Sequence, residues 1–202
     1  MAEQSAGEAR PHTGRRRNEQ VRQAILDAAM RLLARADGGP VSVDTIAREA
    51  GVGKQTIYRW WPSKGAVFLE ALTEHAQTVV PEADTGNLHD DLASVITASF
   101  RGAASPTTAP VLATLVREAA SDAHLARVMG DFTAARRQAL RAVLERGRER
   151  GELADDADLD LMVDQVYGVL WYRLLVGHAA LDAAAAERLA AGLARGNAPV
   201  AE

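Results

Sequence analysis

The most informative part of the sequence is a short segment, residues 45–64, which reads TIAREAGVGKQTIYRWWPSK. Ser42 precedes it and can cap a helix over residues 43–50. Gly51 follows that helix, at a position where the chain must reverse and where glycine tolerates a positive φ. A second short helix is expected over residues 54–61, because the proline after it forces a break. Two short helices joined by a glycine turn are typical of a helix-turn-helix, although the spacing alone also fits an ordinary helical hairpin with a polar surface.

The second short helix carries side chains that are suited to reading DNA. Ile57 is expected to anchor this helix to the core, which leaves its polar and aromatic residues for the outward face or its edge. Glutamine can bond bidentately to adenine, arginine or lysine to guanine, and threonine can touch a thymine methyl group. Tyr58 and Lys64 are placed to bind phosphates and to fix the register. The predicted DNA-binding residues are Ser42, Thr45, Gly53, Lys54, Gln55, Thr56, Tyr58, Arg59, Trp60 and Lys64.

Helical patterns cover the chain on both sides of this segment. Before it, apolar residues recur at three- and four-residue spacing over residues 18–36. After it, helices are expected over residues 63–80, 88–103, 106–120, 124–150, 158–178 and 182–195. No alternating strand pattern longer than four residues occurs, so the predicted fold class is all-α.

These patterns divide the chain into four parts. Residues 1–17 are expected to form a disordered basic arm, which either lies along DNA phosphates or only aids solubility. Residues 18–64 form the predicted helix-turn-helix domain, and residues 65–196 form a second helical domain. Residues 197–202 are expected to be a disordered tail.

Charge is distributed unevenly along the chain. The 202 residues carry a formal net charge of −4, but residues 1–64 hold 11 lysines and arginines against 7 acidic residues. The remaining residues hold 12 against 20, so a basic head precedes an acidic body, as expected if the head meets a polyanion. No run of about 18 apolar residues predicts a membrane span. The absence of cysteine excludes disulfides and thiolate zinc sites, and a cytoplasmic protein is expected.

Residues 45–64 strongly resemble the DNA-binding domain of the TetR family of transcriptional regulators. The family pattern has a Thr-hydrophobic-Ile-Ala group, then Gly-Val, then a Thr-hydrophobic-Tyr-x-aromatic-Phe group and a closing Ser-Lys. The resemblance extends over about residues 18–72. This chain departs from the pattern at Gln55, Trp60 and Trp61. Because Gln55 and Trp60 are expected to face DNA, the operator sequence cannot be carried over from relatives.

The resemblance implies a homodimeric regulator, usually a repressor, with a C-terminal helical domain for ligand binding and dimerisation. Its partners would be a pseudo-palindromic operator in double-stranded DNA and a small organic effector. Family members dimerise through their last two helices, and residues 158–178 are indeed very apolar for an exposed helix. A central core helix is the alternative for this segment. The alternative function is a ligand-independent DNA-binding structural protein, which a fully packed body would favour over an enclosed cavity.

Candidate ligand-binding residues are adaptable apolar side chains and one arginine in the second domain. They are Phe100, Leu115, Met129, Phe132, Met162, Trp171 and Arg173, although an apolar helical residue is a core residue by default. Arg101, Arg117 and Arg173 either pair with a ligand carboxylate, extend outward or pair with an aspartate. No metal or other cofactor is expected, because the histidines are scattered. The sequence has no nucleophile elbow, phosphate-binding glycine loop or dinucleotide fingerprint, so an enzyme is not expected.

Overall fold

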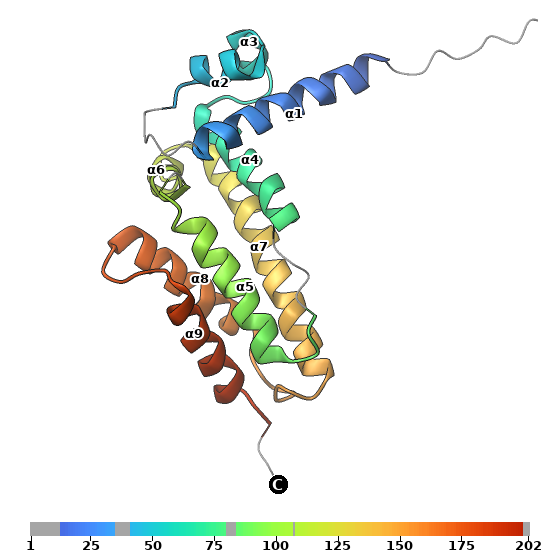
Figure 1. Ribbon diagram of the computed structural model, residues 1–202, viewed down its shortest axis with the longest axis vertical. Helices are drawn as coiled ribbons and strands as arrows, with labels where there is room; N and C mark the ends of the chain where they lie inside the picture. The colour runs from blue at the N-terminus through green and yellow to red at the C-terminus, as the bar shows by residue number, and fades with distance from the viewer. Residues whose placement is uncertain (1–12, 35–40, 80–83, 107, 200–202) are drawn as a thin grey trace, which may run out of the picture.

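The computed structural model describes residues 13–34, 41–79, 84–106 and 108–199. These residues form nine helices and no strand, which confirms the all-α prediction. The helices are α1 (Thr13–Ala34), α2 (Val43–Ala50), α3 (Lys54–Tyr58), α4 (Lys64–Val79), α5 (Leu88–Ala103), α6 (Thr108–Ala119), α7 (Ala123–Glu149), α8 (Leu159–Val176) and α9 (Ala183–Gly196). Figure 1 shows α1–α3 as a head at one end of an elongated body made of α4–α9.

Local sequence signals set the ends of the helices in the head. The Ser42 Oγ accepts a hydrogen bond from the Thr45 backbone N–H at 3.1 Å and so caps α2. Gly51 ends α2 with a φ of +68°, which residues with a side chain rarely adopt. α3 ends at Tyr58, three residues before the expected end. Residues 59 and 60 form a turn after the helix, and Pro62 disfavours helical backbone at Trp61, the residue that precedes it.

The head is held to α4 by apolar packing and by one polar cluster. α1 packs against both α2 and α4, and Trp61 is only 3% exposed. The Trp61 Nε1–H donates to Glu70 Oε2 at 2.6 Å. Arg22 of α1 binds Glu70 as well and also donates to Glu74 Oε1 at 2.5 Å. The indole, the guanidinium and the two carboxylates therefore fix α1 to α4.

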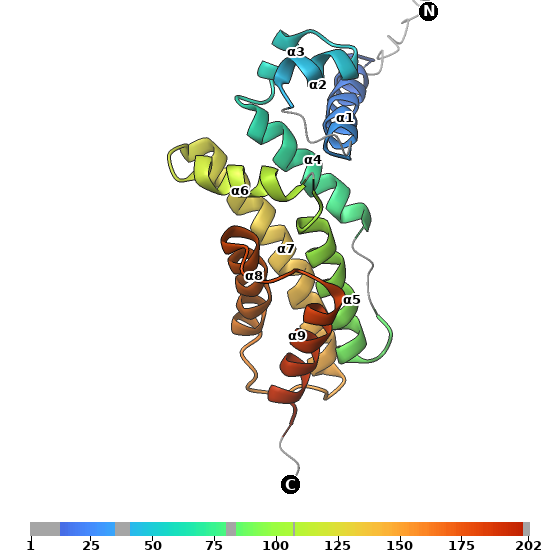
Figure 2. The ribbon, with the colours of Figure 1, turned by 60° about the vertical axis from the view of Figure 1, so that its left-hand side comes forward.

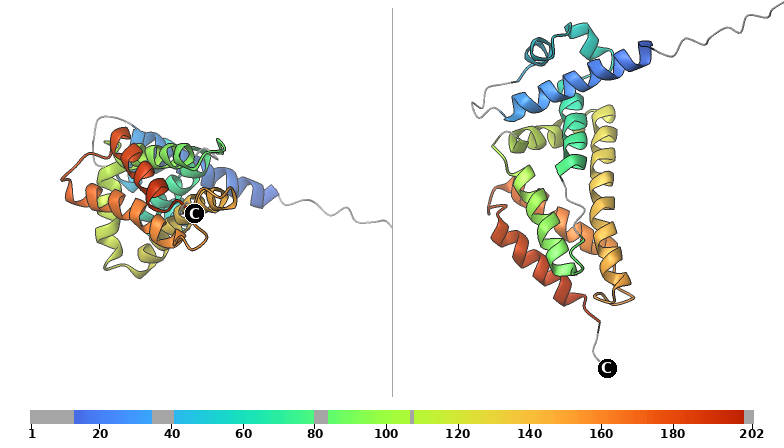
Figure 3. Two further views of the ribbon diagram at one scale, coloured as in Figure 1. Left: turned by 90° about the horizontal axis from the view of Figure 1, so that it is seen from below. Right: turned by 45° about the vertical axis from the view of Figure 1, so that its right-hand side comes forward.

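The body is organised around α7, which has 27 residues. α7 packs against α4, α5, α6 and α8, while α5 also packs along α9 (Figure 2). Gly147 lets α7 approach the start of α5 closely, because a Cβ there would lie 2.6 Å from the Leu88 Cδ1. The right-hand view in Figure 3 shows α4 and α7 side by side near the head. α4, which packs against both α1 and α7, thus connects the head to the rest of the body.

Two ends of the described chain differ from the prediction. α1 begins at Thr13, so residues 13–17, which were expected to belong to the disordered arm, are helical. Arginine favours helix, and the arginine run directly precedes the apolar part of α1. Asn197 was expected in a disordered tail, but its carbonyl accepts a hydrogen bond from the Ala154 N–H at 2.9 Å. Residues 1–12 of the predicted arm and residues 200–202 of the predicted tail lie outside the described residues.

Candidate nucleic-acid interface and ligand pocket

α3 lies at the outer end of the head and exposes its polar side (Figure 1). Ile57 is fully buried and fixes the inner side of the helix to the core of the head. The outer side consists of long polar and aromatic side chains. Lys54, Gln55, Tyr58 and Arg59 are exposed, and Thr56 and Trp60 are half-buried.

The other predicted DNA-binding residues flank α3. Ser42 and Thr45 lie at the start of α2, where their hydroxyl oxygens are 2.9 Å apart. At the start of α4, the Ser63 Oγ accepts a hydrogen bond from a backbone N–H at 3.2 Å, and Lys64 is exposed in the same turn. All ten predicted residues lie between the start of α2 and the start of α4, and none of them is fully buried. These side chains are therefore available to a partner at the outer end of the head.

Charged groups on this surface are organised in pairs. The Lys54 Nζ lies 3.0 Å from the Asp44 Oδ2, and this hydrogen bond and charge raise the pKa of Lys54. The same ammonium lies 5.9 Å from the centroid of the Tyr58 ring. The Arg59 Cζ lies 5.4 Å from the centroid of the Trp60 ring. Sequence reasoning missed the pairing of Lys54 with Asp44, because these residues lie on different helices and are ten positions apart.

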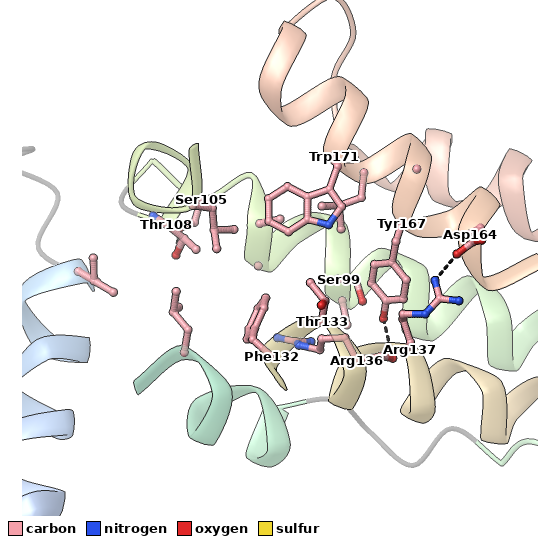
Figure 4. A pocket seen from close by; sticks show the side chains of 18 of the residues that line it. Ser99, Ser105, Thr108, Phe132, Thr133, Arg136, Arg137, Asp164, Tyr167 and Trp171 are labelled. Carbon is pink, nitrogen blue, oxygen red and sulfur yellow. Dashed lines mark hydrogen bonds and ion pairs between the residues drawn. The ribbon is translucent and has the colours of Figure 1, made fainter. Parts of the chain in front are cut away.

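A pocket of about 660 Å³ lies at the junction between the head and the body. α1 contributes Met30 and Leu33 to its wall, and α4 contributes Leu72. The rest of the wall comes from the segment that contains α5–α8. It consists of Ala98, Ser99, Gly102, Ala103, Ser105, Thr108, Leu112, Phe132, Thr133, Arg136, Arg137, Asp164, Tyr167, Gly168, Leu170 and Trp171 (Figure 4). The pocket is mainly apolar and contains a few polar groups, which is typical of small-molecule sites.

Two successive arginines of α7 line this pocket in different surroundings. Arg137 forms an ion pair with Asp164 of α8. Arg136 instead lies against the Phe132 ring, with its Cζ 5.3 Å from the ring centroid (Figure 4). The Tyr167 hydroxyl donates a hydrogen bond to the Arg136 carbonyl oxygen at 2.9 Å and so joins α8 to α7. Burial raises the pKa of Tyr167, which keeps its phenol neutral.

The pocket includes two of the seven predicted ligand-binding residues, Phe132 and Trp171. The other five lie outside its wall. Phe100, Leu115 and Met162 are at most 2% exposed within the core, Met129 packs against the core, and the Arg173 guanidinium donates to the Ala180 carbonyl oxygen at 2.6 Å. Arg101 and Arg117 are exposed and also lie outside the pocket wall. Apolar periodicity identifies the inner face of a helix, but it does not separate a packed side chain from one that lines a pocket.

Sequence reasoning missed the polar part of the pocket, above all Arg136. One signal could have identified it. Arg136 follows Phe132 by four positions, and residues four apart on a helix lie on the same face. If Phe132 lines a pocket, Arg136 is therefore expected to line it too.

α8 exposes an apolar stripe on the surface of the body. Four large apolar side chains, Leu161, Tyr172, Leu175 and Val176, are 47–60% exposed. Gly168 lies between them at helical spacing and is exposed, and a Cβ added to it would meet no atom within 4 Å. The Asp158 side chain caps this helix by accepting a hydrogen bond from the Leu161 N–H at 3.0 Å. Such a stripe is typical of a surface that another protein chain covers.

Two further kinds of site were sought in the described part of the chain. No cluster of three or more histidine or acidic side chains there could hold a metal ion. No helix among those residues has both the length and the apolar character that crossing a membrane requires.

Comparisons with known proteins agree with the arrangement of head and body. The family described as "Bacterial regulatory proteins, tetR family" matches residues 25–71. The family described as "Tetracyclin repressor-like, C-terminal domain" matches residues 82–193, which is more than half of the chain. These two matches coincide with the helix-turn-helix and with the body that contains the pocket.

Individual relatives extend over most of the chain. The uncharacterized HTH-type transcriptional regulator YdeS of Bacillus subtilis is 35% identical over 164 residues, which are 81% of this chain and 82% of that protein. The DNA-binding transcriptional repressor TetR of Mycobacteroides abscessus is 33% identical over 170 residues, which are 80% of this chain and 85% of that protein. The crystal structure of the TetR family transcription regulator SCO0332 has a TM-score of 0.79 and 31% identity, and it covers 89% of this chain and 100% of that chain. The chain therefore belongs to the TetR family of DNA-binding transcriptional regulators, which are not enzymes.

Proposed function

We propose that this protein is a homodimeric repressor that leaves its operator when a small organic molecule occupies the pocket. The position of the pocket carries this proposal, because its wall includes side chains of α1 and α4 as well as side chains of α5–α8. A ligand that fits one arrangement of these helices better than another shifts the balance between the two arrangements. The alternative, a structural DNA-binding protein without a ligand, gives no role to such a pocket.

In this proposal α3 enters the major groove of the operator. Gln55 would read adenine, Arg59 or Lys54 would read guanine, and Thr56 would touch a thymine methyl group. Tyr58 and Lys64 would bind phosphates and fix the position of the helix. The exposure of these side chains supports the assignment, since only Thr56 among them is half-buried. A function on chromosomal DNA also agrees with the expected cytoplasmic location.

The apolar stripe of α8 would form the dimer interface, together with α9. Its four large side chains are exposed in the single chain, and burying them against a second copy is favourable. α9 is rich in alanine, and small residues let two helices approach each other closely. A twofold dimer would present two copies of α3 and would therefore require a pseudo-palindromic operator.

A nuclease-protection footprint on the DNA that flanks the gene tests this function. The purified full-length protein is expected to protect a pseudo-palindrome whose half-sites lie about one helical turn, or a multiple of it, apart. Lys64→Ala is the matched head variant, and it should weaken protection without changing the helical content measured by circular dichroism. If the flanking DNA shows no protection, binding sites are selected from random DNA. Selection of sequences with no common motif would overturn the proposal.

The ligand-dependent part is tested on the same operator fragment. Compounds that raise the melting temperature of the protein are added to the footprint reaction. The expected result is that a bound compound removes the protected region. Compounds that bind the pocket and leave protection unchanged at saturation would favour the ligand-independent alternative.

A further inference from the structure

The Arg136 guanidinium is a charged group in a mainly apolar pocket. Its Cζ lies 5.3 Å from the centroid of the Phe132 ring, and Figure 4 shows its head group beside that ring, near Ser99 and Thr133. It makes no ion pair and no side-chain hydrogen bond within the described residues of the chain. Burial lowers the pKa of Arg136, which means that the surroundings disfavour its charge. A cation held in this way has donors available for another molecule.

The other charged groups of the pocket do not neutralise it. Asp164 is the carboxylate in the pocket wall, and it pairs with Arg137. Arg141, one turn further along α7, pairs with Asp160 at 2.6 Å and with Glu145 at 3.0 Å. The wall therefore contains two arginines and one aspartate, which leaves one positive charge in excess.

The hydroxyl groups near Arg136 already have partners. The Tyr167 O–H donates to the Arg136 carbonyl oxygen at 2.9 Å. The Thr133 hydroxyl bonds to the carbonyl oxygens of Met129 and Gly130 at 3.0 and 2.9 Å. Tyr167 also fixes the backbone of Arg136, because its bond joins α8 to α7 at that residue. The N–H groups of the Arg136 guanidinium are thus available to an occupant of the pocket.

We propose that the effector is an organic anion with an apolar body, and that its carboxylate pairs with Arg136. This inference rests on the proposed function, because it takes the pocket as the effector site. A guanidinium presents parallel N–H groups that match the two oxygens of a carboxylate. The Phe132 and Trp171 rings and the leucines of the wall would enclose the apolar body. A pocket of about 660 Å³ is within the usual range for small-molecule sites.

Isothermal titration with matched probes tests the preference for an anion. The anions are decanoate and 2-naphthoate, and the neutral counterparts are 1-decanol and 2-naphthalenemethanol. At least one anion is expected to bind the wild-type protein about tenfold or more tightly than its neutral counterpart. Equal binding of each pair would overturn the proposal. So would the failure of both anions to bind at concentrations up to about 1 mM.

Arg136→Met tests the residue that is assigned to the carboxylate. It should weaken binding of the anion by roughly 30-fold or more, because the ligand carboxylate loses its partner in the pocket. It should not weaken binding of the neutral counterpart. Arg141→Met is the matched control, since it removes one positive charge from the same helix outside the pocket wall. Its anion affinity should stay within about threefold of the wild-type value. Similar losses in both variants would contradict a specific pairing.

Thermal melting separates a ligand-binding role of Arg136 from a structural one. Without ligand, Arg136→Met should melt at the wild-type temperature or above it, because it removes a half-buried charge that has no acidic partner in the pocket wall. A fall of more than about 5 °C would indicate a structural role instead. The footprint of the ligand-free wild-type protein tests the regulator proposal separately. A clear footprint combined with no preference for anions overturns only the identity of the effector.

Discussion

Gln55 and Tyr58 occupy different positions on the exposed side of α3 and are assigned different roles. Gln55 lies in the first turn, where the helix would point into the groove, and carries two hydrogen-bonding groups for a base edge. Tyr58 lies at the end of the helix, 43% exposed, with a hydroxyl that suits a phosphate. A base contact affects the choice of sequence, whereas a phosphate contact affects every sequence. These assignments can therefore be separated by measuring the affinity for operator DNA and for random DNA.

Gln55→Ala is expected to relax the sequence preference. It should reduce discrimination against a changed operator base by about 1–3 kcal/mol and affect random DNA little, because it removes a contact to a base edge. Tyr58→Phe should instead weaken binding to operator and random DNA by similar factors. Fluorescence anisotropy with both DNAs, at one fixed salt concentration, measures the two effects. An equal loss of affinity for all sequences in Gln55→Ala would show that Gln55 does not read a base.

Asp91 is a buried carboxylate whose charge contributes to stability. Burial alone would raise its pKa, but hydrogen bonds from the Thr85 N–H and hydroxyl, both 2.7 Å long, and from Arg150 outweigh this effect and lower the pKa. Since the folded-state pKa lies below the ordinary value of 3.8, the contribution is complete above that pH. It is lost as the pH falls through the folded-state value.

Asp91→Asn is expected to destabilise the protein at neutral pH by about 2 kcal/mol, because the charged hydrogen bonds are lost. The difference from wild type should shrink as the pH falls below about 3.8. Urea unfolding of both proteins at several pH values measures this difference in the free energy of unfolding. Asp90→Asn is the control, because Asp90 is exposed at the preceding position. This variant should have nearly the wild-type free energy of unfolding. A difference that stays constant from neutral to acid pH would exclude the charge as the cause.

At the scale of elements, the head combines rigid positioning of α3 with a charge pair across the turn. The Ser42 cap, Gly51 and the Ser63 cap set the boundaries of α2 and α4, so that α3 is held between them. Asp44 of α2 is bonded to Lys54 at the start of α3. DNA phosphates would compete with this carboxylate for the lysine. If Lys54 contacts DNA as proposed, the charge pair would reduce the electrostatic attraction of the free head for DNA.

Asp44→Asn is expected to increase the affinity for DNA at low salt. The head would then carry one more uncompensated positive charge near the DNA phosphates, and the slope of log K against log salt should become more negative by up to about 0.9. Anisotropy titrations at several salt concentrations measure this slope. Asp27→Asn removes an equal charge from an exposed position on α1 and serves as the matched control. Equal changes of the slope in both variants would show that net charge alone causes the effect, and would exclude a specific role of the Lys54–Asp44 pair.

At the scale of the whole molecule, the pocket and the apolar stripe share α8. Tyr167 and Trp171 of α8 line the pocket, whereas Tyr172 and Leu175 lie exposed on its surface. α1, which packs on the helix-turn-helix, borders the same pocket through Met30 and Leu33. A ligand would thus touch helices that connect both to the head and to the proposed dimer interface. This connection gives a physical route from ligand binding to the spacing of two heads.

Leu175→Arg is expected to convert the proposed dimer to a monomer, because it places a charge in an apolar interface. Sedimentation velocity should show one species of about the 21.5 kDa chain mass. Affinity for the complete operator should fall by about 100-fold or more, since the second half-site no longer contributes. Gln138→Arg, at an exposed position on α7, is the control and should remain dimeric. An unchanged sedimentation coefficient for Leu175→Arg would place the interface elsewhere.

Most of the fold follows from signals between neighbouring residues. The caps at Ser42 and Ser63, the glycine at position 51 and the apolar periodicity are local, and the helices they predict are present. α5 is present over the residues expected for it. The main differences lie at helix ends or beyond them, at Thr13, Tyr58 and Asn197. They follow from the helix preference of an arginine run, from a proline after α3 and from one tertiary hydrogen bond, respectively.

The sequence by itself determined the helix-turn-helix and the exposed residues of α3, because the chemistry of that site comes from one continuous segment. Only the tertiary structure decided which residues line the pocket, since its wall combines side chains from α1 to α8 that are as much as 141 positions apart, from Met30 to Trp171. It also distinguished Arg136 from Arg137, which are adjacent in the sequence and alike in chemistry. One of them meets an aspartate from α8 and the other does not. That difference depends on the packing of one helix against another, which no local pattern encodes.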